Sequence, residues 1–279
     1  MKKYLKILFI FLFVINTNLT QAEVISGNIK EDVQATRKNQ VIDSKTGAGV
    51  DSAKITLPQK NYSTYTDQNG YFDLDTKINK KTILSVEKQG FRPFSITIDK
   101  NIEGTPLRLG IEQMRAGDVI LNKNLVHLGD DQFSATSANS NEFKKSANGP
   151  FWSKKVALKK PDKKEKATLV IGSIIGLDTK MAKKLGQNNI ISVYSSPAEI
   201  IFNGKKISEL TINGDNQEIE IPSSLITGND EITIKTGKNL FQREYIDYDD
   251  MEFMNLRIEY REKSLFANFW NRRKLKKIV

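Results

Sequence analysis

The chain has 279 residues, with 43 lysines and arginines against 33 aspartates and glutamates, and a formal net charge of +10. It contains no cysteine and a single histidine, His127. Disulfides, thiol catalysis and cysteine-based metal sites are therefore excluded, and a zinc carboxypeptidase site with two histidine ligands cannot be built. The length suits one large domain or two medium-sized domains.

The positive charge is concentrated in three short segments. Residues 1–22 hold three lysines, residues 154–166 hold seven lysines against two acids, and residues 272–277 hold five basic residues and no acid. The rest of the chain is slightly acidic. A nucleic-acid surface needs base-reading or stacking elements beside its charge, and the sequence offers none. We therefore predict no nucleic-acid partner, and we expect the last two segments to be a solvated loop and a tail.

The first 22 residues have the three parts of a secretory signal. A lysine-rich start precedes an apolar run from Leu5 to Ile15, and the segment ends in Thr20-Gln21-Ala22. We predict export, with cleavage after Ala22, to the periplasm, the cell surface or the medium. The alternative is an uncleaved membrane anchor, although the run is shorter than the ~20 residues that a spanning helix needs. An exported, cysteine-free, lysine-rich chain is typical of bacteria.

Residues 23–110 alternate apolar and polar residues in short segments separated by glycine-bearing turns. Such strands at spacings of about ten residues predict a β-sandwich. The segment Thr-Asp-Gln-Asn-Gly-Tyr-Phe, residues 66–72, is expected to form the turn of a β-hairpin, because Asn69 and Gly70 tolerate a positive φ.

Three motifs in this region carry a family resemblance. Thr46-Gly47, residues 66–72 and Gln89-Gly90-Phe91 together resemble the carboxypeptidase regulatory-like domain, over residues 41–98. The resemblance implies a transthyretin-like sandwich of seven strands. It also implies an accessory module without peptidase chemistry of its own, and the histidine count agrees with that.

Residues 111–262 continue the alternation, and Asn203-Gly204 predicts a two-residue hairpin. Residues 201–204, 219–222 and 228–234 occur in an order similar to that of galactose-binding-like jelly rolls. The predicted fold is therefore all-β, with a transthyretin-like sandwich, a jelly-roll sandwich and a short C-terminal helix.

Five aspartates lie beside the first and last predicted strands of this second domain. Asp130 and Asp131 follow the first strand, whereas Asp247, Asp249 and Asp250 precede the last. The first and last strands of a jelly roll usually pair, so we expect the two groups to be neighbours. Clustered carboxylates suit Ca²⁺, and the resemblance implies a structural calcium ion at this end. The alternative is that these are solvated acids in turns.

Two aromatic residues are candidates for ligand binding. Trp152, which follows Phe151, and Tyr194 are of the type that stacks on sugar rings, and packing in the sandwich is the alternative. His127 is more typical of a packed strand residue than of a catalytic base. We therefore predict a non-enzymatic binding protein with carbohydrate as the favoured ligand. A structural or adhesion component that binds an envelope protein is the alternative, and a hydrolase whose acids lie in the second domain is a third hypothesis.

The tail, residues 263–279, has the pattern of a basic amphipathic helix. Leu265-Phe266 and Phe269-Trp270 are four residues apart, and residues 272–277 are almost all basic. Such a helix can lie on an anionic membrane surface, or it can dock on the body of the protein.

If the tail binds membranes, removing residues 263–279 will abolish sedimentation of the protein with anionic liposomes, because it removes both the apolar face and the basic charge. Neutral liposomes serve as the control. Equal sedimentation of the full and shortened chains would contradict the membrane prediction.

Overall fold

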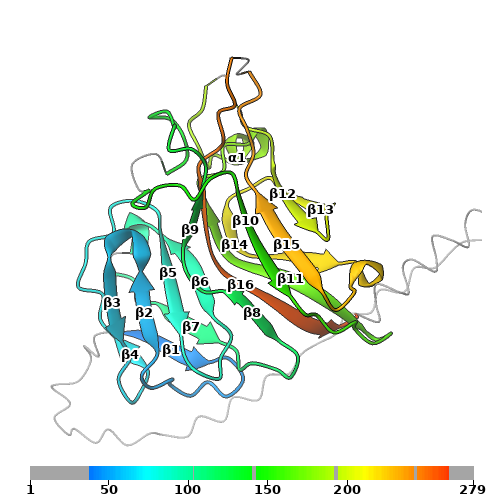
Figure 1. The fold of residues 1–279 in the computed structure, drawn as a ribbon. Coiled ribbons are helices and arrows are strands. Elements are labelled where there is room, and N and C mark those ends of the chain that lie inside the picture. Colours follow the sequence, from blue (N-terminus) through cyan, green and yellow to red (C-terminus); the bar gives the residue numbers. More distant parts are fainter. Residues whose placement is uncertain (1–37, 103, 140–142, 192–193, 242–243, 264–279) are drawn as a thin grey trace, which may run out of the picture. The chain divides into compact units, whose positions relative to one another are not determined.

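The computed structural model describes residues 38–102, 104–139, 143–191, 194–241 and 244–263. They form two β-sandwiches with little helix, so the chain is all-β as predicted (Figure 1). The predicted signal peptide and nearly all of the predicted tail helix lie outside the described residues. Within the described parts, no helix is long and apolar enough to cross a membrane.

The first sandwich consists of a three-stranded sheet, in the order β4-β1-β7, and a four-stranded sheet, in the order β3-β2-β5-β6. One apolar core lies within this sandwich, and β1 and β7 run parallel. Its strands are β1 (Asn39–Asp43), β2 (Lys54–Leu57), β3 (Tyr62–Tyr65), β4 (Tyr71–Phe72), β5 (Thr82–Glu87), β6 (Phe94–Ile98) and β7 (Arg108–Ile111).

The turn predicted at residues 67–70 is present, but the hairpin predicted around it is wrong. The Asp67 carboxylate accepts a hydrogen bond from the Tyr71 N–H at 2.9 Å, and Gly70 has a φ of 80°. A Cβ at Gly70 would lie 2.3 Å from the Val41 carbonyl oxygen, so only glycine fits. However, β3 pairs with β2, and β4 pairs with β1 in the opposite sheet. The turn therefore carries the chain across the sandwich, because alternation along a strand does not specify its partner.

The second sandwich consists of a five-stranded and a four-stranded antiparallel sheet. The first has the order β14-β11-β16-β8, with β9 also paired to β16, and the second has the order β10-β15-β12-β13. The hairpin predicted at Asn203-Gly204 is confirmed, since Phe202 pairs with Lys205 across it. The elements are β8 (Val119–Asn122), β9 (Val126–Leu128), β10 (Phe151–Val156), β11 (Glu165–Ile175), α1 (Lys180–Lys184), β12 (Ala198–Phe202), β13 (Lys205–Leu210), β14 (Gly214–Ile221), β15 (Asp230–Lys235) and β16 (Met251–Glu262).

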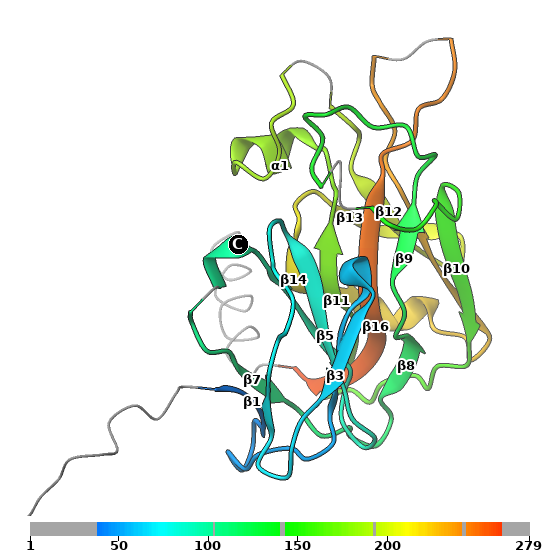
Figure 2. The ribbon, with the colours of Figure 1, turned by 90° about the vertical axis from the view of Figure 1, so that its left-hand side faces the viewer.

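Strand β16 is covered on both faces, and residues 251–259 are all buried. Phe253 and Leu256 belong to the core of the second sandwich. On the other face, Met254 packs with Ile83 of the first sandwich. The Asn255 side-chain amide donates to the Ser85 hydroxyl at 2.9 Å. Figures 1 and 2 show β5 of the first sandwich beside the sheet that contains β11 and β16. The two sandwiches therefore share an interface that contains both apolar and polar contacts.

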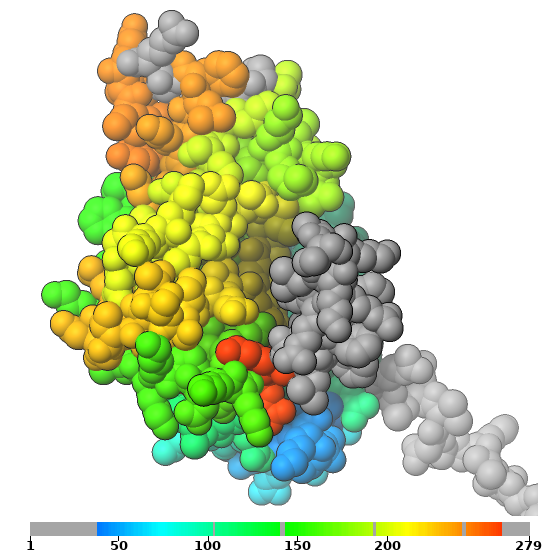
Figure 3. All heavy atoms as spheres, turned by 90° about the vertical axis from the view of Figure 1, so that its right-hand side faces the viewer, coloured from blue at the N-terminus to red at the C-terminus, as the bar shows by residue number. Residues whose placement is uncertain are grey.

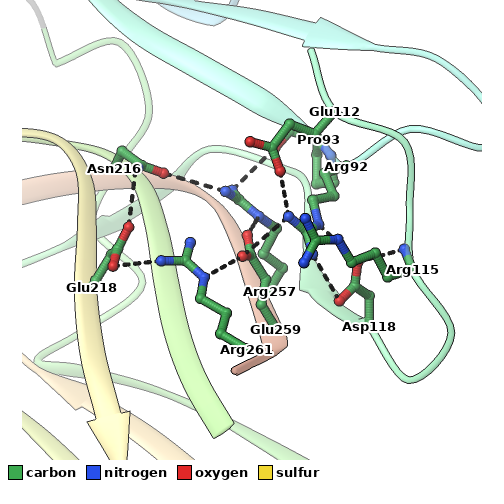
Figure 4. A network of polar contacts seen from close by, with 10 residues as sticks. All are labelled: Arg92, Pro93, Glu112, Arg115, Asp118, Asn216, Glu218, Arg257, Glu259 and Arg261. Atoms are coloured by element: carbon green, nitrogen blue, oxygen red, sulfur yellow. Dashed lines mark hydrogen bonds and ion pairs between the residues drawn. The ribbon is translucent and has the colours of Figure 1, made fainter. Parts of the chain in front are cut away.

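A network of charged side chains lies in this interface near the C-terminal end of β16 (Figure 4). Arg92, from the first sandwich, contacts Asp118 at 2.8 Å and Glu259 at 3.2 Å. Glu259 also accepts from Arg257 at 2.6 Å and from Arg261 at 2.7 Å. Burial by itself raises the pKa of Glu259, but the hydrogen bonds from these two arginines, together with the charge of Arg92, outweigh it and lower the pKa. The carboxylate is therefore ionised and fully compensated.

Replacing Arg92 by Met is expected to lower the free energy of unfolding by about 3–5 kcal/mol, because it leaves the buried carboxylate of Asp118 without its cation and removes one of the three arginines around Glu259. Urea unfolding monitored by tryptophan fluorescence gives this value. Lys206→Met is the matched control. It removes exposed pairs with Glu199 and Glu209 and should cost no more than about 1 kcal/mol. Equal losses in both variants would show that the network does not hold the interface.

Candidate functional site

Three strand ends of the second sandwich meet at one end of the five-stranded sheet. Leu128 of β9 opposes Met251 of β16, and Ile175 of β11 opposes Glu252. The loops after β9, after β11 and before β16 therefore lie together. Figure 3 shows parts of the last two side by side, in lime and orange. A pocket of about 390 Å³ opens among these loops.

Asp130 and Asp131 join these loops through backbone hydrogen bonds. Asp130 accepts from the Tyr248 N–H at 2.9 Å, and Asp131 accepts from the Ala147 N–H at 3.0 Å. The expected proximity of the two acidic groups is thus present, because β9 pairs with β16. However, these two carboxylates are occupied by backbone donors, and neither lines the pocket.

Asp247, Asp249 and Asp250 all line the pocket. Asp247 is half-buried and accepts from the Asn239 amide at 3.2 Å. Asp249 and Asp250 are only 5% and 4% exposed. One oxygen of Asp250, Oδ1, accepts from the Asp131 N–H at 3.0 Å. The other, Oδ2, is buried and has no hydrogen-bond partner among the described residues.

His127 is fully buried on β9 and bonded through both ring nitrogens. Nε2 lies 2.9 Å from Asp250 Oδ1, and Nδ1 lies 2.6 Å from the Lys145 carbonyl oxygen. Burial alone lowers the pKa of His127, but the bonds to Asp250 and Lys145 outweigh it, so the pKa is raised. An oxygen atom therefore faces each ring nitrogen.

Asp178 is a fourth pocket acid that sequence reasoning missed. It lies shortly after β11, is 5% exposed, and accepts from the Ala138 N–H at 2.8 Å. Its own N–H donates to Asp249 at 3.1 Å. Burial raises the pKa of Asp178 to about 6, and burial together with the charge of Asp178 raises the pKa of Asp249 well above its usual range. An acid soon after an apolar strand is the signal that could have found it.

One group of side chains among the described residues could hold a metal ion. It consists of His127, Asp131 and Asp250, whose ligand atoms all lie within 4.8 Å of one another. The calcium predicted at the five aspartates stays a prediction.

The two aromatic residues predicted to bind a ligand lie elsewhere. Trp152, on β10, is half-buried and meets the Phe253 ring edge-on, with the ring centroids 6.0 Å apart. Tyr194 lies before β12, and its carbonyl accepts from the Leu240 N–H. Neither residue lines the pocket, whereas Tyr248 and Phe133 do. A binding role for Trp152 and Tyr194 stays a prediction.

Exposed apolar side chains surround the pocket loops. On the loop before β16, Phe241 is 65% and Tyr245 is 52% exposed. Ile191, on the neighbouring loop, is 83% exposed and lines the pocket. Such side chains, gathered beside a polar pocket, are typical of binding surfaces.

Asp178→Asn tests the electrostatics of the pocket. In the wild-type protein, the unfolded state loses the Asp178 proton near pH 3.8, whereas the folded state keeps it until about pH 6. The stabilisation from this group is therefore complete below pH 3.8 and is lost as the pH rises through 6. Asn keeps the bond to Ala138 but does not titrate, so the variant should lose less stability between pH 4 and 6. Urea unfolding in chelator at both pH values measures the difference. Identical pH slopes would contradict this assignment.

Comparison with known proteins finds one family model that matches part of the chain. No curated protein matches the sequence. Residues 39–120, less than a third of the chain, match the family model of the CarboxypepD_reg-like domain. The match spans β1 to β7, confirms the resemblance for the first sandwich and reaches into β8, but leaves the pocket outside it. The first sandwich is thus similar to a non-catalytic regulatory-like domain.

Proposed function

We propose that this chain is an exported, non-catalytic binding protein of the cell envelope or the extracellular space. Its carbohydrate ligand binds at the pocket end of the second sandwich. Export rests on the N-terminal sequence. The non-catalytic role is supported by the regulatory-like first sandwich and by the engagement of His127 at both ring nitrogens.

The mixed lining of the pocket is the observation that carries this proposal. Asp247 and Asn239 offer acceptors and a donor to sugar hydroxyls, and the aromatic residues Tyr248 and Phe133 belong to the same lining. A sugar ring has a polar edge and an apolar face, so it matches this combination. The volume of about 390 Å³ is within the range of small-ligand sites. The proposed binding site therefore lies at the loops around β16 and not at Trp152 and Tyr194, the residues predicted from the sequence.

The adhesion alternative also has a specific observation in its favour. The loop before β16 exposes Leu240, Phe241, Tyr245 and Ile246, each by more than half of its surface. A protein partner buries such side chains more completely than a sugar does. Recovery of one stable envelope partner by pull-down, lost in Phe241→Ser, would favour this second function.

Glycan-array screening followed by calorimetry tests the carbohydrate proposal. Tyr248→Ala and Asp247→Asn should each weaken binding of the selected glycan by about tenfold or more, because each removes one contact of the pocket. Tyr65→Ala, an exposed tyrosine on β3 that is 61% exposed, is the matched control and should bind normally.

Two outcomes would contradict the proposal. A loss of affinity in Trp152→Phe with normal binding by Tyr248→Ala would return the site to the residues predicted from the sequence. Cleavage of the bound glycan, detected by mass spectrometry, would instead favour the hydrolase hypothesis.

A further inference from the structure

Four lysines are gathered on one short loop at the end of the second sandwich opposite the pocket. The loop, residues 157–164, joins β10 to β11, and its only acid is Asp162. The four lysines are all exposed, and they are Lys159, Lys160, Lys163 and Lys164. Among the described residues, none of these four forms an ion pair, whereas the nearby Lys166 pairs with Glu220 at 3.5 Å. The loop therefore presents a concentrated positive charge to the solvent.

The backbone of this lysine loop is fastened to the body of the sandwich. Leu158 is only 3% exposed and belongs to the core of the second sandwich. The Lys159 carbonyl accepts a hydrogen bond from the Tyr260 hydroxyl at 2.7 Å, and the Lys164 carbonyl accepts one from the Lys263 N–H at 2.7 Å. Because these contacts use backbone carbonyls, they hold the loop in place and leave its lysine side chains in the solvent. Little further ordering of the backbone is then needed to bind a partner.

The sheet pairing places the lysine loop at the start of the basic tail. Glu165, the first residue of β11, opposes Glu262, the last residue of β16, so the loop lies beside the point where residues 263–279 continue the chain. These two acids reduce the local charge, but neither forms an ion pair with a lysine in the described parts of the chain. The tail sequence adds six basic residues, no acid and apolar residues such as Phe269 and Trp270.

The two ends of the second sandwich carry opposite charges. The lysine loop precedes the first residue of β11, whereas the pocket with its four acids, which include Asp178, lies beyond the last. Strand β11 has 11 residues, so the two ends are roughly 30 Å apart at about 3.3 Å per residue. Figure 1 shows them at opposite ends of β11 and β16. A negatively charged surface attracts the loop end and repels the pocket end.

We propose that residues 157–164 form a docking surface for an anionic phospholipid membrane, and that they act together with the tail. Bound in this way, the protein holds its pocket on the side away from the membrane. Lysine charge alone suits many polyanions, but the apolar residues of the adjoining tail match a bilayer better than a water-soluble polymer. The loop has no aromatic side chain on which a nucleic-acid base could stack. This surface is separate from the proposed carbohydrate site, so either proposal can fail alone.

Sedimentation of the full mature chain with lipid vesicles tests the role of the loop. Each lysine near an anionic surface contributes about fivefold to binding. The double variant Lys163→Gln with Lys164→Gln should therefore bind vesicles of phosphatidylglycerol and phosphatidylcholine about tenfold more weakly than the wild type. Its backbone contacts are unchanged, so the fold is kept.

The matched control removes the same charge at the pocket end. Lys180 and Lys184 are exposed on α1, and the double variant Lys180→Gln with Lys184→Gln should bind these vesicles as the wild type does. Equal affinities of the two double variants would overturn the proposal, because the position of the charge would then have no effect.

The nature of the partner is tested with other surfaces. Binding to the anionic vesicles should weaken as NaCl is added, because salt screens exposed charges. Vesicles of phosphatidylcholine alone should not sediment the protein. Retention of the protein on dextran sulfate without sedimentation by anionic vesicles would identify an acidic polymer as the partner and overturn the membrane proposal.

Energy transfer from single labels tests the orientation. The chain has no cysteine, so Asp162→Cys in the loop and Met181→Cys on α1 each create one labelling site. Both positions are exposed. Transfer to a rhodamine-labelled lipid falls steeply with distance, so it should be stronger from position 162 than from position 181. Equal or stronger transfer from position 181 would overturn the proposed orientation.

Discussion

Strand β16 is the element on which the rest of the structure depends. Its apolar face completes the core of the second sandwich, whereas its other face carries Asn255, Arg257 and Glu259 into the interface with the first sandwich. Buried polar groups need partners, and the first sandwich supplies them, through Ser85 and above all through Arg92. The regulatory-like sandwich therefore covers the polar face of β16 and supplies partners for its buried side chains. Because β9 and β11 both pair with β16, the same strand also fixes the place where the pocket forms.

The acids at this end of the second sandwich differ in whether they line the pocket. Asp130 and Asp131 lie outside its lining, and they accept hydrogen bonds from the Tyr248 and Ala147 N–H groups. Asp178 and Asp249 line the pocket, and burial raises the pKa of both. Asp250 also lines it, and its Oδ1 lies 2.9 Å from Nε2 of the buried His127.

Much of the fold could be read from the sequence, because alternation and turn residues are local signals. The hairpin at Asn203-Gly204 and the family of the first sandwich were both correct. The turn at residues 67–70 was also correct, but the pairing around it was not, since β4 joins the opposite sheet. For the site, the expected pairing of the first and last strands of the second domain predicted that five aspartates lie close together. The pairing of β9 with β16 brings them together. Asp178 was missed because its contact with Asp249 depends on how β11 lies beside β16.

The sequence by itself determined the strand content, the absence of cysteine chemistry and the impossibility of a two-histidine zinc site. It also placed acids shortly after β9 and directly before β16, the two strands whose pairing positions the pocket. The tertiary structure alone decided that Trp152 packs against Phe253, that His127 is a core residue bonded at both ring nitrogens and that the polar face of β16 is buried. These outcomes depend on contacts between distant parts of the chain, such as Arg92 with Glu259. A period-two pattern shows that a strand has a polar face, but whether water or another sandwich covers that face is settled only when the sheets pack.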